Sequence, residues 1–89
     1  MRKIKAILLY WLREYDYTLE EHFDGDLWLH DNQDSTVEDR PVTLIELCDM
    51  FISQLENKRH YADAEATYYF TFNINALEEY KRELKGVKA

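Results

Sequence analysis

The sequence predicts an α+β domain in which a small, mostly antiparallel sheet, a hairpin plus one long strand, packs with three helices. Three observations favour this class. Apolar residues recur at helical spacing near the N-terminus, an Asp-Gly-Asp turn separates two segments with strand periodicity, and a run of aromatic and β-branched residues lies further on. At 89 residues the chain fits one domain, residues 1–89, with the order α-β-β-(β)-α-β-α.

The first expected element is a helix from about Lys3 to Tyr15. Its apolar residues are three or four positions apart, as one face of a helix requires. These residues are Ile4, Ile7, Leu8, Trp11, Leu12 and Tyr15. Because this apolar face is wide, we expect the helix to be central to the core.

A β-hairpin with its turn at Asp24-Gly25-Asp26 is expected next. The apolar residues that alternate on either side of the turn are Tyr17, Leu19, Phe23, Leu27 and Leu29. A two-residue loop would place Leu27 and Leu29 on the wrong face, whereas a three-residue loop sets Phe23 opposite Leu27 and gathers all five on one face. The other face then carries Glu20, His22, Trp28 and His30.

A short edge strand at Thr36–Glu38 and a second helix are expected to follow. Thr43 and Glu46 form a capping box, in which the first residue caps the helix and the second lies three positions later. The helix should run to about residues 54–57. Its expected buried stripe consists of Leu44, Leu47, Cys48, Phe51 and Leu55.

Residues 58–63 are predicted to be a linker. The segment from Glu65 to Ile74 has the strongest strand pattern in the chain, because aromatic and β-branched residues favour strands. Asn75 is the expected cap of a last helix, and Gly86 its stop. The apolar stripe of that helix is Leu77, Tyr80 and Leu84.

Charge is distributed very unevenly along the chain. From Glu14 to Asn57 the sequence has thirteen carboxylates and only one Lys or Arg, which is Arg40. Such a block creates a field of one sign, which repels nucleic acid and anionic membranes and attracts basic protein surfaces. We therefore expect no membrane and no direct nucleic-acid binding. The expected partner-contact residues are Glu20, Glu21, Asp24, Asp26, Trp28, Asp31, Asp34, Glu38 and Asp39.

The sequence has no pattern typical of an enzyme, a metal site or a cofactor site. Cys48 is the only cysteine, and its position on an apolar stripe favours a buried, inert thiol. The His and Asp residues around the hairpin turn match no metal-ligand spacing. With no disulfide and no signal-peptide cleavage pattern, we expect a cytoplasmic protein. We predict no cofactor and no catalytic residue.

In size, acidity and aromatic richness, the whole chain resembles the small acidic inhibitor proteins of bacteriophages and mobile elements, including anti-CRISPR proteins and other DNA mimics. This resemblance implies a non-enzymatic inhibitor that occupies a basic nucleic-acid groove, such as that of a CRISPR effector or another host-defence nuclease. Two alternatives stay open: a structural or regulatory protein that self-associates through its Tyr-rich segment, and an antitoxin-like protein that neutralises a basic enzyme. Because the net charge of −7 opposes self-pairing, we expect a monomer.

Overall fold

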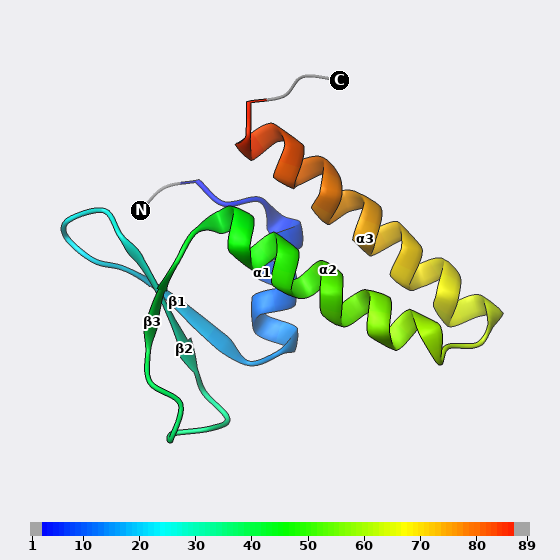
Figure 1. Ribbon diagram of the computed structural model, residues 1–89, viewed down its shortest axis with the longest axis horizontal. Coiled ribbons are helices and arrows are strands. Elements are labelled where there is room, and N and C mark those ends of the chain that lie inside the picture. Colours follow the sequence, from blue (N-terminus) through cyan, green and yellow to red (C-terminus); the bar gives the residue numbers. More distant parts are fainter. Residues whose placement is uncertain (1–2, 87–89) are drawn as a thin grey trace. The chain divides into compact units, whose positions relative to one another are not determined.

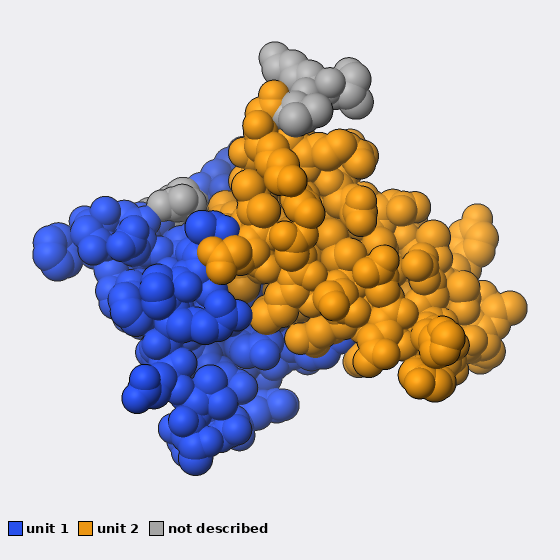
Figure 2. All heavy atoms as spheres, viewed as in Figure 1, with its two compact units in different colours: residues 1–43 blue, residues 44–89 orange. Residues whose placement is uncertain are grey.

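A computed structural model describes residues 3–86, which form three α-helices and a three-stranded antiparallel sheet (Figure 1). This confirms the α+β class. The chain divides into two compact units, coloured separately in Figure 2. Unit 1, residues 1–43, contains α1 and the sheet, and unit 2, residues 44–89, contains α2 and α3. A single domain spanning the chain stays a prediction.

In unit 1, α1 spans Ala6–Glu14, a shorter helix than predicted, and buries three residues of the expected apolar face: Leu8, Trp11 and Leu12. Asp16 follows with a φ of 58°, a left-handed conformation that Asp adopts more readily than most residues. Its carbonyl accepts a hydrogen bond of 3.1 Å from the backbone N–H of Asn32, which ties the start of the sheet to its second strand.

The expected hairpin is formed by β1 (Tyr17–Glu21) and β2 (Leu27–Asp31). Leu19 faces Leu29, so the apolar residues of the two strands share one face, as predicted. The loop has the predicted three residues but comprises Phe23, Asp24 and Gly25, one position earlier than expected. The backbone N–H of His22 donates to the Asp26 carbonyl at 2.8 Å and closes this loop.

The position of the loop follows from Gly25, whose φ of 92° suits the left-handed residue of a three-residue hairpin turn. Phe23 was expected opposite Leu27. This expectation is wrong, because Phe23 lies in the loop and is fully exposed. Glu21 occupies the position opposite Leu27 instead.

The third strand, β3, spans Arg40–Val42 and pairs with β2 at the sheet edge, so the predicted strand at Thr36–Glu38 is wrong. Asp34 bends the earlier segment into a turn, in which its carboxylate accepts hydrogen bonds from the N–H and the hydroxyl of Thr36. Pro41 is tolerated in β3 because an edge strand does not need every backbone N–H.

In unit 2, α2 spans Leu44–His60 and begins directly after Thr43, where the capping box predicts. It continues beyond the predicted end and takes in part of the expected linker. Its buried residues are the whole predicted stripe, Leu44, Leu47, Cys48, Phe51 and Leu55, together with Ile52.

The third helix, α3, spans Ala64–Leu84 and packs along α2 (Figure 1). The strand predicted at Glu65–Ile74 is therefore wrong, and so is the cap predicted at Asn75. Asp63 is the actual cap, with its carboxylate accepting the backbone N–H of Ala66 at 2.8 Å. The residues that α3 buries recur at helical spacing and are Asn73, Ile74, Leu77 and Tyr80. Packing of this stripe outweighs the strand preference of the aromatic run.

Candidate partner-binding surface on the sheet

One face of the sheet in unit 1 carries Trp28 and is called the Trp28 face. Strand alternation places Thr18, Glu20, His22, Trp28 and His30 on it. Glu20 pairs with Trp28 across β1 and β2, and Pro41 pairs with Trp28 across β2 and β3. The His22 and Trp28 rings stack with centroids 5.0 Å apart and planes 9° apart. This stack holds a half-buried aromatic side chain in place beside an exposed carboxylate.

The Trp28 face lacks the one cation of the acidic block. Arg40 pairs with Leu29 across β2 and β3, so alternation places it on the opposite face of the sheet. The residues that line a hollow of about 70 Å³ beside it, among them Tyr17, Leu29 and Asp31, agree with this placement. The sheet therefore separates its only Arg from Glu20 and Trp28.

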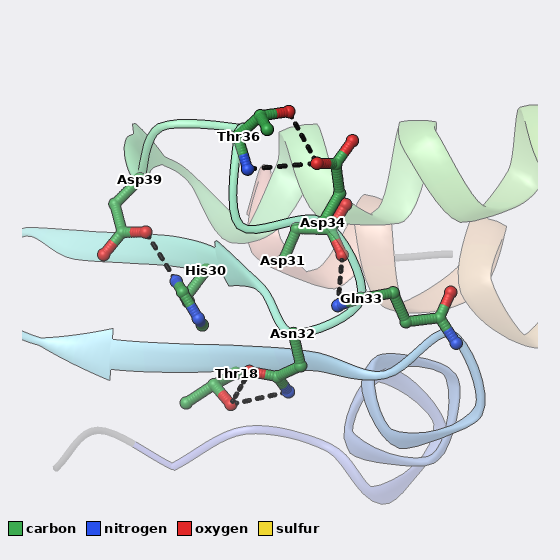
Figure 3. A network of polar contacts seen from close by, with 8 residues as sticks. All are labelled: Thr18, His30, Asp31, Asn32, Gln33, Asp34, Thr36 and Asp39. Atoms are coloured by element: carbon green, nitrogen blue, oxygen red, sulfur yellow. Dashed lines mark hydrogen bonds and ion pairs between the residues drawn. The ribbon is translucent and has the colours of Figure 1, made fainter.

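His30 and Asp39 form an ion pair at one end of the Trp28 face, with 2.6 Å between Nδ1 and the carboxylate Oδ1 (Figure 3). The hydrogen bond that His30 donates to the Asp39 carboxylate raises the pKa of His30 above its ordinary value of 6.5, and desolvation opposes this shift. The charges of Asp31 and Glu20 raise it further. The histidine thus neutralises part of the acidic charge on this face when it is protonated.

Three of the predicted contact carboxylates shape loops (Figure 3 shows two of them). Asp24 accepts the N–H of Asp26 at 3.1 Å in the hairpin turn, and Asp31 accepts the N–H of Gln33 at 2.9 Å. The hydrogen bonds from Thr36 lower the pKa of Asp34 below its ordinary value of 3.8. These oxygens are engaged within the chain, so charge reversal at these positions would disturb the turns as well as the surface.

The nine predicted contact residues thus fall into three groups. Four belong to the Trp28 face or join it: Glu20 and Trp28 within the strands, Asp26 opposite His22 just before β2, and Asp39 through its ion pair. Two lie on the opposite face: Glu21 and Asp31. The other three lie in loops and belong to neither face: Asp24, Asp34 and Glu38. The acidic surface on the Trp28 face is therefore smaller than the acidic segment from Glu14 to Asn57 suggested.

Sequence reasoning placed His22 and His30 on the correct face but missed their contacts. The stacking of His22 on Trp28 could be inferred from the hairpin register, since the two residues are diagonal neighbours on adjacent strands. The His30–Asp39 pair could not, because Asp39 reaches His30 only when β3 begins at Arg40 rather than at Thr36.

Unit 2 contains the only cysteine of the sequence, Cys48, which is fully buried in α2. Burial raises the pKa of its thiol to about 11, so the reactive thiolate is scarce at neutral pH. Nearby, Lys81 and Asp49 form an ion pair of 2.5 Å between α3 and α2. Among residues 3–86, no group of three or more His, Cys, Asp or Glu side chains is arranged to hold a metal ion.

Within the described part of the chain, no helix combines the length and the apolar character that crossing a membrane requires. Comparisons with protein-family models, curated proteins and solved structures find no match to this chain.

Proposed function

We propose that this protein is a non-enzymatic inhibitor that binds a basic nucleic-acid-binding protein in the cytoplasm, with the Trp28 face as its contact surface. The observation that carries the proposal is the segregation of charge on the sheet. Glu20 lies opposite Trp28, and Asp26 lies opposite His22 just before β2, so alternation places both on the Trp28 face, whereas Arg40 lies on the other. An anionic surface with an anchored aromatic side chain suits a groove that normally receives phosphates and bases.

Each component of the Trp28 face has a counterpart in such a groove. Lys and Arg side chains that neutralise phosphates would pair with Glu20 and Asp26. Trp28 would be the aromatic anchor, because large rings held rigidly contribute most of the affinity at many interfaces. His22, stacked on Trp28, limits the conformational freedom that the ring would lose on binding. CRISPR effectors and other defence nucleases are partners of this chemical type.

The proposal can be tested with a charge-reversal variant, Glu20→Lys/Asp26→Lys. Neither carboxylate has a role in a turn comparable to those of Asp24 and Asp34, so the fold should be retained. Immobilised wild-type protein should capture nucleic-acid-binding proteins from a nuclease-treated bacterial lysate, and added duplex DNA should release them. The variant should capture them at least about ten-fold less well, because it places like charges in contact.

The matched control is Glu14→Lys/Glu56→Lys, which changes the net charge equally at exposed helix positions outside the sheet. This control should retain most of the capture. If the two double variants lose capture equally, binding depends on net charge alone and the Trp28 face is not the contact surface. Capture that duplex DNA fails to release would contradict occupation of a nucleic-acid groove.

A further inference from the structure

The outer face of α3 in unit 2 carries a groove of about 370 Å³, here called the α3 groove. Its lining residues are spaced three or four apart along the helix and are Ala64, Thr67, Tyr68, Thr71, Phe72 and Asn75. None of them belongs to the stripe that α3 buries, which begins at Asn73. The α3 groove is thus a second apolar face of the helix, separate from the packed one.

Two aromatic side chains dominate the α3 groove. Tyr68 is 82% exposed and Phe72 is 70% exposed, although each is one helical turn from the other. Neighbouring aromatics left this accessible typically mark an interaction site. Between them in sequence, Phe70 is partly buried and Tyr69 is 46% exposed, so the two most exposed aromatic side chains of α3 lie on one side of the helix.

The threonines of the α3 groove already have hydrogen-bond partners within unit 2. Thr71 accepts a hydrogen bond of 3.2 Å from the guanidinium of Arg59, which comes from α2. The Thr67 hydroxyl donates to the Ala62 carbonyl at 3.5 Å. Each hydroxyl thus has one hydrogen-bond partner within unit 2, and the lining of the α3 groove is mostly apolar, which favours an apolar occupant over a polar one.

Carboxylates on either side of the α3 groove along the helix indicate the charge that its occupant should carry. Glu65 and Glu79 lie seven residues before and after Phe72, which is about 10 Å along the helix in each direction. Both are exposed, and α3 itself has no Lys or Arg before Lys81, although the guanidinium of Arg59 from α2 contacts Thr71 in the groove lining. An aromatic surface with a carboxylate at each end is complementary to an apolar stripe flanked by cations.

A second copy of the chain does not satisfy this pattern. An antiparallel pair of α3 helices centred on Phe72 would set Glu65 of one copy against Glu79 of the other, and it would do so twice. A parallel pair in register would set each glutamate against its own counterpart. The net charge of −7 adds to this repulsion.

We propose that the α3 groove binds a basic amphipathic helix of a partner protein. The apolar face of that helix packs on Tyr68 and Phe72, and cations near its two ends pair with Glu65 and Glu79. Helices bind in grooves in this way when apolar residues at three- and four-residue spacing meet a complementary apolar surface. This binding surface is distinct from the Trp28 face and does not depend on it.

The test uses a synthetic amphipathic peptide of about 18 residues, with leucines on one face and lysines about 14 positions apart. Titration into ¹⁵N-labelled protein should shift the amide signals of the α3 groove. The Tyr68→Ala/Phe72→Ala variant should bind about ten-fold more weakly, since both rings are lost. Its helical circular dichroism should be retained because both side chains are exposed.

Charge variants separate this proposal from the previous one. Glu65→Lys/Glu79→Lys should weaken peptide binding more than the equally charged control Glu14→Lys/Glu56→Lys, whereas Glu20→Lys/Asp26→Lys should resemble that control. A peptide with glutamates in place of the lysines should not bind the wild-type protein. Equal binding by wild type and Tyr68→Ala/Phe72→Ala would overturn the proposal. A wild-type dimer that dissociates in this variant would overturn it in favour of a second copy.

Discussion

Units 1 and 2 both place aromatic side chains near carboxylates, but they do so through different secondary structure. In unit 1, the two-residue period of the strands puts Glu20 beside Trp28 and sends Arg40 to the other face. In unit 2, the helical period of α3 puts Tyr68 and Phe72 on the outer face and turns Ile74 inward. The type of element thus decides which residues form a surface.

This difference matters most for the aromatic run of α3. As a strand, the run would place Tyr68, Phe70 and Phe72 on one face. As a helix, it separates Phe70 from the other two and creates the α3 groove. Whether this one segment is a strand or a helix therefore decides which of its aromatic side chains share a surface.

The largest expected effect is a difference in stability between substitutions on the buried and the exposed face of α3. Leu77→Ala removes a side chain with 0% exposure and should lower the free energy of unfolding by about 2–5 kcal/mol. Phe72→Ala removes a larger side chain that is mostly exposed, and should change it by no more than about 0.5 kcal/mol. Urea denaturation followed by circular dichroism measures both values. Similar losses in the two variants would contradict the assignment of these faces.

A smaller effect is expected at the cap of α3. Asp63→Ala removes the acceptor of the Ala66 N–H and should destabilise the protein by about 1 kcal/mol. Asp63→Ser keeps an oxygen that can accept this hydrogen bond and should recover most of the loss. Asn75→Ala is the matched control within the same segment. If it costs more than Asp63→Ala, the helix begins at Asn75 and the aromatic run is not helical.

In unit 1, substitutions at Gly25 test the left-handed backbone conformation of the hairpin loop. Gly25→Ala forces a side chain onto a residue with a φ of 92° and should cost about 1–2 kcal/mol, although no atom lies within 4 Å of the added Cβ. Gly25→Asn should cost less, because Asn tolerates left-handed conformations. Equal stability of the Ala variant and the wild type, by the same denaturation assay, would contradict the position of the loop.

The smallest effect concerns the His30–Asp39 pair. Because Asp39 raises the pKa of His30, the pair stabilises the folded state fully below pH 6.5, and the stabilisation is lost as pH rises through the higher folded value. Titration of the imidazole signals by NMR should show a midpoint above 6.5 that falls in Asp39→Asn. Asp34→Asn, in the same loop, is the control and should leave that midpoint unchanged. If the Asp39→Asn substitution leaves the titration midpoint of His30 unchanged, the His30–Asp39 pair does not form.

The sequence predicted much of unit 1 because its determinants are local. Alternating residues identified both strands of the hairpin, and the short spacing around Gly25 limited its loop to a few residues. The position of β3 depended on Asp34, whose carboxylate turns the chain before the strand begins. A turn of this kind is hard to place from the sequence, since Asp, Ser and Thr occur at several neighbouring positions.

Unit 2 was predicted less well because tertiary packing decides it. The stripe of α2 has an unambiguous helical period, but Tyr68, Tyr69 and Phe72 favour strands locally. Their helical conformation follows from the cap at Asp63 and from burial of Ile74 and Leu77. For the same reason the α3 groove was not apparent in the sequence, whereas the charge segregation that led to the Trp28 face was.

The most direct test of the Trp28 face is the association rate with the partner recovered by capture, measured from low to high salt. The acidic surface predicts a fast rate that falls as salt rises, because charges are screened beyond about 8 Å at physiological ionic strength. Glu20→Lys/Asp26→Lys should slow association at low salt and flatten its salt dependence more than Glu14→Lys/Glu56→Lys does. A rate that does not change with salt, or equal changes in both variants, would contradict the account.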